Sequence, residues 1–155
     1  MAHRYCELFV HLVWSTFDRA RLVGPLVESD VWAAIGREAR RSNCKAIEIG
    51  GTDDHVHSLV AMHPSTSVAE LVKRMKGASS HMMTHVAAPE RAFKWQEGYG
   101  AFSVSKANVD VVAAYIRGQR AHHASGRLVP GWEQTGFVPL VPQITGGVPE
   151  APSNG

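Results

Sequence analysis

The chain of 155 residues has the length of one ordinary domain, and its 45% hydrophobic and 19% charged residues are typical of a globular protein. This balance excludes a wholly disordered or fibrous chain, and no run of about 18 apolar residues is present to span a membrane. A net charge of +2 does not by itself indicate nucleic acid, and two cysteines form no disulfide framework, so we expect a protein of the reducing cytoplasm.

The first half of the chain reads as a strand, a helix and two further strands. Residues 5–16 alternate as a strand that is apolar on both faces, which is typical of a central strand in a sheet. Residues 29–42 have helical spacing, and residues 45–50 and 55–62 form short strands on either side of a turn.

The second half adds a helix, a strand and a last helix. Ser67 and Glu70 have capping-box spacing at the start of a helix that ends before Pro89. Residues 101–104 form a short strand, and residues 109–124 form a helix. The order β-α-β-β-α-β-α predicts an α+β fold with a ferredoxin-like (RRM-like) βαββαβ sheet and an added C-terminal helix.

A change in composition after the last helix divides the chain. We assign residues 1–126 to one folded domain and residues 127–155 to a Pro/Gly-rich tail. The segment 128–155 holds five of the eight prolines and no Lys or Arg, so we expect the tail to be partly disordered. We also expect a chain that ends at Gly126 to keep its fold and any metal binding.

His55 and His57 are the first residues that could carry chemistry. Side chains alternate along a strand, so both imidazoles face one side, about 7 Å apart. Such a pair can hold a divalent cation if a third ligand approaches, and Asp53 and Asp54 either add a carboxylate or only shape the turn. In a chain with nine histidines, the alternative is a pair of satisfied core residues.

Tyr115 and Gln119 are the second candidates, on the last helix. Their i, i+4 spacing places them on one face, away from the apolar stripe, with His122 one turn further on. The alternative is a half-buried tyrosine at the edge of the core.

Positive charge gathers in the middle of the chain. Residues 70–127 hold nine Lys and Arg against four Asp and Glu, which would suit a polyanion or a solvated helix surface equally well.

Several segments of the chain form one ordered set of motifs: HLVWST (11–16), Asn43-Cys44, DHVHSLV (54–60), KRMKGASS (73–80), residues 95–105, Tyr115-Ile116-x-x-Gln119 and His122-His123. In this order they resemble one family, the single-tyrosine (Y1) HUH transposases of the IS200/IS605 type. Two positions depart from the family pattern: Gly118, where the family often has asparagine, and Ser58, where it often has a larger apolar residue.

The resemblance implies a DNA transposase that cleaves and rejoins single-stranded DNA at hairpin-bearing element ends. Tyr115 would be the nucleophile that forms a covalent 5′-phosphotyrosine, and His55, His57 and Gln119 would bind one Mg²⁺ or Mn²⁺ per active site. The resemblance also implies a homodimer, in which the tyrosine helix of one chain completes the active site of its partner in trans. Such an enzyme would act on DNA of the nucleoid. The residues expected to contact DNA phosphates are Lys73, Arg74, Lys76, Arg117 and Arg120.

Three other functions use the same features. A domesticated relative would bind or nick hairpin or repeat single-stranded DNA without transposition, and a nickase would process chromosomal repeats. A ferredoxin-like ligand-binding domain would keep its histidines in the core without metal. The intact set of His55, His57, Tyr115 and Gln119 favours an active enzyme.

Overall fold

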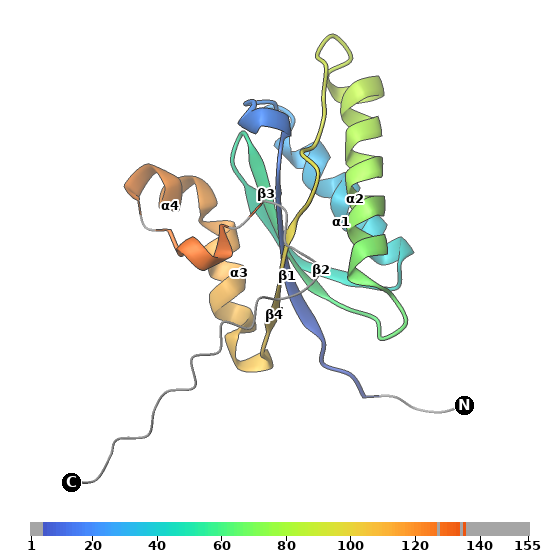
Figure 1. Ribbon diagram of the computed structural model, residues 1–155, viewed down its shortest axis with the longest axis vertical. Helices are drawn as coiled ribbons and strands as arrows, with labels where there is room; N and C mark the ends of the chain where they lie inside the picture. The colour runs from blue at the N-terminus through green and yellow to red at the C-terminus, as the bar shows by residue number, and fades with distance from the viewer. Residues whose placement is uncertain (1–4, 127, 134, 136–155) are drawn as a thin grey trace, which may run out of the picture.

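The computed structural model describes residues 5–126, 128–133 and 135 (Figure 1). Within these residues, four strands form one antiparallel sheet in the order β2-β3-β1-β4. The strands are β1 (Phe9–Ser15), β2 (Lys45–Gly51), β3 (His55–Ala61) and β4 (Gly100–Val104). With α1 (Glu28–Arg41) after β1 and α2 (Val68–Met82) after β3, this is the ferredoxin-like arrangement, so the predicted fold is confirmed.

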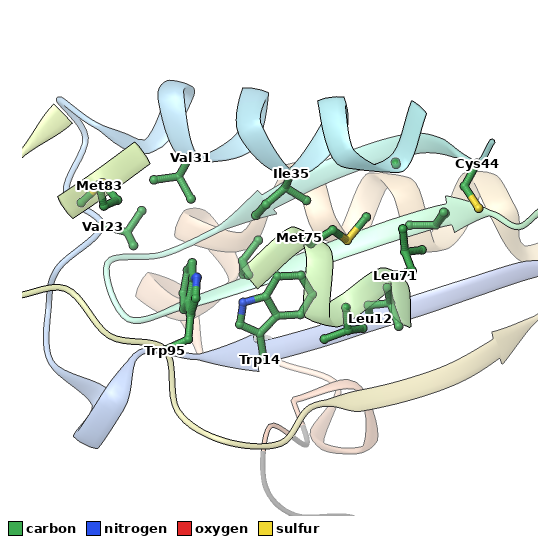
Figure 2. Close-up of a cluster of buried hydrophobic side chains, with 14 of the residues drawn as sticks. Leu12, Trp14, Val23, Val31, Ile35, Cys44, Leu71, Met75, Met83 and Trp95 are labelled. Carbon is green, nitrogen blue, oxygen red and sulfur yellow. The ribbon is translucent and has the colours of Figure 1, made fainter. Parts of the chain in front are cut away.

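Helices α1 and α2 cover one face of the sheet and enclose the main hydrophobic core (Figure 2). Leu12 and Trp14 of β1 point into this core, where they meet Ile35 of α1 and Met75 of α2, all fully buried. Burying each such side chain contributes about 1.5–3 kcal/mol. The hydroxyl of Ser67 accepts a hydrogen bond from the backbone N–H of Glu70, as the capping-box spacing predicts.

The opposite face of the sheet carries α3 (Val109–Arg117) and α4 (Gln119–Ser125) (Figure 1). A smaller apolar cluster, formed by Leu59, Val112, Ala113 and Ile116, packs α3 onto β3. Gly50 allows the close approach of α3, because a Cβ atom there would lie 2.4 Å from the carbonyl oxygen of Ile116. Backbone contact of this kind fixes the height of α3 above the strands.

The last helix differs from its prediction in one respect. The single helix expected over residues 109–124 is divided at Gly118, whose φ of −91° and ψ of 15° are not helical. Glycine is poorly suited to a helix interior, and this break turns α4 away from the axis of α3. Gly126, with φ of 71°, ends α4 in the left-handed conformation that glycine favours.

Shorter elements complete the described chain. Residues 128–133 are the largest part of the expected tail that the structure describes, and they contain a short 3-10 turn. The short elements are η1 (Phe17–Arg19), a π turn η2 (Met83–Ala87), η3 (Lys106–Asn108) and η4 (Pro130–Trp132). Among the described helices, none has the length and apolar character needed to cross a membrane.

Candidate active site

Strand β3 presents His55 and His57 on the face that α3 covers. Both side chains are fully buried, and their ring centroids lie 5.1 Å apart. Because the two positions alternate with Val56, which belongs to the core on the other face, the pair shares one direction as the sequence predicts.

Tyr115 and Gln119 lie directly above this pair. The amide oxygen Oε1 of Gln119 is 3.1 Å from Nε2 of His55, and the ring of Tyr115 lies 6.0 Å from the ring of His57. The structure therefore brings together the four residues that the sequence selects, although the break at Gly118 places Tyr115 in α3 and Gln119 in α4.

Glu133 also belongs to this group, although sequence reasoning did not select it. Its Oε2 atom lies 3.2 Å from Nε2 of His57 and 3.4 Å from Nε2 of His55. Its Oε1 atom accepts a hydrogen bond from the hydroxyl of Tyr115, which also accepts one from the backbone N–H of Val129. Glu133 follows η4 in a Pro/Gly-rich segment without periodicity, so no local pattern marks it.

His11 and His123 complete the surroundings of the histidine pair. Nε2 of His11, buried on β1, lies 2.8 Å from Nδ1 of His57, and the two rings stack. Nε2 of His123 lies 3.1 Å from Nε2 of His55. The i, i+4 spacing from Gln119 to His123 is a signal that could have identified His123 from the sequence.

The tautomer of His55 follows from its neighbours. Asp54 Oδ1 lies 2.8 Å from Nδ1 of His55, and this hydrogen bond lowers the pKa of Asp54, so the carboxylate is ionised. An ionised carboxylate only accepts, so the ring proton lies on Nδ1 and the lone pair of Nε2 faces Gln119. The amide nitrogen of Gln119 is directed to the backbone oxygen of Tyr115, which leaves its oxygen facing that lone pair.

The positions of these nitrogen and oxygen atoms fit a divalent cation. Nitrogen and oxygen atoms of His55, His57 and Glu133 all lie within 4.8 Å of one another. Donors that share one ion at about 2.1 Å lie about 3 Å apart when they occupy adjacent octahedral positions. The separations of 3.1 Å, 3.2 Å and 3.4 Å match that value, so the residues present suit a metal ion.

The same contacts shift the pKa values of the nucleophile candidate and its partner. Burial and the hydrogen bond to Glu133 raise the pKa of Tyr115, so the phenol is protonated at neutral pH. Burial would raise the pKa of Glu133, but hydrogen bonds from His57 and Tyr115 outweigh burial and lower this pKa to about 2. Burial lowers the pKa of His57 and of His123, which keeps both imidazoles neutral and able to act as ligands.

The basic residues expected at DNA are dispersed rather than gathered at this site. Lys73 and Arg74 lie on α2, across the sheet from Tyr115, and Arg74 pairs with Glu70. Lys76 donates to the backbone oxygens of residues 96 and 98, and burial lowers its pKa to about 8.

Two arginines lie closer to the tyrosine, at the end of α3 and the start of α4. Arg117 pairs with Glu48 at 2.8 Å, and Arg120 pairs with Glu28 and with Asp53, each at 2.7 Å.

Comparisons with known proteins show the same fold in solved structures. A candidate transposase from Deinococcus radiodurans R1 has a TM-score of 0.60 at 23% identity and covers 77% of this chain and 95% of its own. A REP-associated tyrosine transposase bound to a REP hairpin has a TM-score of 0.58 at 12% identity, and the match covers 83% of this chain and 74% of that chain. The curated ISDra2 transposase TnpA of Deinococcus radiodurans is 27% identical over 119 residues, which are 73% of this chain and 84% of that protein.

The family match defines the class of protein as a transposase, a DNA-processing enzyme. The model of one family, described as IS200-like transposases, matches residues 4–119. Because this match covers most of the chain, the chain belongs to the IS200-like transposase family.

Proposed function

We propose that this chain cleaves and rejoins single-stranded DNA at hairpin-bearing ends of a mobile element. One observation carries the proposal: the carboxylate of Glu133 links the Tyr115 hydroxyl to the histidine pair. One carboxylate oxygen accepts a hydrogen bond from Tyr115, and the other lies beside Nε2 of His55 and of His57. A nucleophile beside a divalent-metal site is an arrangement that can catalyse phosphodiester transfer. The hairpin in the solved tyrosine transposase supports a hairpin substrate for this chain.

The proposed reaction proceeds in two steps with Tyr115 as the nucleophile. The phenolic oxygen attacks the scissile phosphorus, the bond to the 3′ oxygen breaks, and a 5′-phosphotyrosine forms. The phenolic proton leaves along the hydrogen bond to Glu133, and the departing 3′ oxygen takes a proton from solvent. The 3′-hydroxyl of a second DNA strand then attacks the same phosphorus, the bond from phosphorus to Tyr115 breaks, and the phenolate regains a proton, so strands are joined without ATP.

His55, His57 and Gln119 are the proposed ligands of one Mg²⁺ or Mn²⁺ ion, with Glu133 as a further oxygen donor. When bound, a divalent ion offsets the charge of the phosphate and polarises its P–O bonds. Asp54 and His11 hold the two imidazoles so that each presents Nε2 to this position.

DNA phosphates are the proposed partners of Lys73, Arg74, Lys76, Arg117 and Arg120. Lys73 is exposed on α2, whereas Arg117 and Arg120 would exchange their carboxylate partners for phosphate. Arg117 and Arg120 are the strongest of these candidates, because each is within five residues of Tyr115.

A homodimer is proposed because one tyrosine can hold one cleaved end at a time. The single chain places Tyr115 above its own histidine pair, and exchange of the α3–α4 segment would complete the partner's site in trans. A DNA substrate of this kind places the protein in the cytoplasm, at the nucleoid. Residues 1–126, together with the segment that carries Glu133, are the proposed catalytic domain.

Covalent trapping tests the proposal. The protein is mixed with labelled single-stranded oligonucleotides from both flanks of its gene, with Mn²⁺ or with EDTA, and run on a denaturing gel. We expect a metal-dependent protein–DNA adduct in the wild type that is absent from Tyr115→Phe and His57→Ala. Tyr99→Phe is the matched control and should form the adduct normally.

Other outcomes have definite meanings. An adduct that persists in Tyr115→Phe would contradict the assignment of the nucleophile. Hairpin binding with no adduct from any end sequence would leave a binding protein, and an adduct that never transfers to a second strand would favour the nicking relative.

A further inference from the structure

His123 repeats, one turn later, the spacing that relates Tyr115 to Gln119. Its Nε2 atom lies 3.1 Å from Nε2 of His55 and 3.1 Å from Oε1 of Gln119. Its ring centroid is 4.6 Å from that of His55, and the side chain is about one-third exposed. The imidazole nitrogen therefore faces the same point as two of the proposed metal ligands.

The neighbours of this nitrogen are acceptors. His55 presents the lone pair of Nε2 because Asp54 holds its proton on Nδ1, and Gln119 presents its amide oxygen. The ionised carboxylate of Glu133 is 3.7 Å from Nε2 of His123. Without an ion, His123 satisfies these acceptors by donating its Nε2 proton; in the other tautomer, the lone pair of Nε2 faces the same point.

We propose that His123 is an additional ligand of the divalent ion, so that the site offers a third imidazole beside His55 and His57. This inference rests on the metal site of the proposed function and identifies the class of ion that it takes. Imidazole nitrogen binds transition-metal ions well, whereas Mg²⁺ prefers oxygen ligands and retains much of its water. The third imidazole therefore raises the affinity of the site most for Co²⁺ and Zn²⁺, and more for Mn²⁺ than for Mg²⁺.

Calorimetric titration of the metal-free protein without DNA tests this selection. Wild type and His123→Ala are each titrated with Mn²⁺ and with Mg²⁺. We expect the variant to bind Mn²⁺ about tenfold or more weakly, and its affinity for Mg²⁺ to change by less than about twofold. His85→Ala, which removes a histidine on the far side of the sheet, is the matched control and should bind both ions as the wild type does.

The visible absorption of Co²⁺ reports the ligands directly. We expect the Co²⁺ spectrum of His123→Ala to differ from that of the wild type, and the spectrum of His85→Ala to coincide with it. His123 lies in a short surface helix, so circular dichroism should show an intact fold in the variant.

Two results would overturn the inference in different ways. Equal Mn²⁺ affinity and identical Co²⁺ spectra in wild type and His123→Ala, with binding lost in His57→Ala, would remove His123 from the ligand set and leave the proposed function standing. Failure of the wild type to bind Mn²⁺ or Co²⁺ would overturn both the inference and the metal site itself.

Discussion

His11 is the buried residue on which the orientation of His57 depends. Its Nε2 atom contacts Nδ1 of His57, and in the described part of the chain its own Nδ1 has no hydrogen-bond partner. Burial lowers the pKa of His11 to about 3, so the ring is neutral and can either donate to His57 or accept from it. Without an ion, the ring proton of His57 lies on Nε2 and is donated to Glu133; when an ion takes that position, the proton moves to Nδ1, where His11 can accept it.

Substitution of His11 by phenylalanine tests this positioning role. His11→Phe retains an aromatic ring of similar size but leaves Nδ1 of His57 unpaired, which costs about 1–3 kcal/mol of stability. We expect Mn²⁺ affinity to fall about 10- to 100-fold, measured by calorimetry. His11→Gln, which restores a polar group near Nε2, should recover part of the affinity; equal affinities in all three proteins would contradict the role.

Because of Glu133, we expect the free energy of unfolding to vary with pH in the acid range. Its folded-state pKa of about 2 lies below the ordinary value of 4.5, so the folded state binds a proton less readily than the unfolded state. The carboxylate therefore stabilises the fold fully above about pH 4.5, and this contribution is lost as the pH falls towards 2.

The Glu133→Gln variant should lack that dependence. We expect the difference in unfolding free energy between wild type and Glu133→Gln to shrink as the pH is lowered from 6 to 3, because glutamine carries no charge at any pH. Urea denaturation at a series of pH values measures this difference. A constant difference over the whole range would show that Glu133 does not interact with His57 and Tyr115 as an ionised group.

At the scale of elements, the strands and helices follow from patterns in the sequence, and the exceptions have physical causes. The alternation in residues 5–16 predicts a central strand, and β1 is buried on both faces between β3 and β4. The break at Gly118 depends on the backbone conformation of one glycine, and helical periodicity in the sequence does not predict it. Glu133 reaches the site through a tertiary contact made by a segment without a repeating pattern, so local sequence could not place it.

Contact between α3 and β2 holds Tyr115 above the histidine pair. A methyl group at Gly50 would collide with the backbone oxygen of Ile116, and backbone cannot rotate away as a flexible side chain can. We expect Gly50→Ala to destabilise the protein by about 1–3 kcal/mol, measured by chemical denaturation, and to reduce DNA adduct formation.

Gly77 on α2 provides a matched control. A Cβ atom there meets nothing within 4 Å, so Gly77→Ala should be neutral or should stabilise the helix by about 0.5–1 kcal/mol. If Gly50→Ala were as stable as Gly77→Ala, α3 would not depend on close contact with β2 for its position.

At the scale of the whole molecule, the sheet separates the main hydrophobic core from the candidate active site. The larger core lies between the sheet and α1–α2, whereas α3 is held by the smaller cluster on the other face. The segment that carries Tyr115 is therefore attached by less buried apolar surface than the rest of the fold. This division agrees with the proposed exchange of α3–α4 between two chains, because that exchange would leave the main core intact.

Truncation after Gly126 should leave the fold intact but remove part of the candidate active site. The sequence alone predicts that such a chain keeps both its fold and its metal binding, but the structure places Trp132 against the rings of His11 and Tyr115, and Glu133 against His57. We therefore expect the 1–126 chain to unfold cooperatively with nearly unchanged α-helical content, because no buried residue of either core cluster lies in the lost segment, although Trp132 packs against the smaller cluster.

Metal binding should not survive truncation unchanged. Loss of the Glu133 carboxylate removes one oxygen donor, so Mn²⁺ affinity should fall about tenfold or more in the 1–126 chain. Full-length Glu133→Ala separates the two causes: an equal fall there would assign the effect to the carboxylate, and a much smaller fall would assign it to the segment as a whole. If the 1–126 chain bound Mn²⁺ as tightly as the full chain, Glu133 would be a neighbour of the metal site and not a ligand.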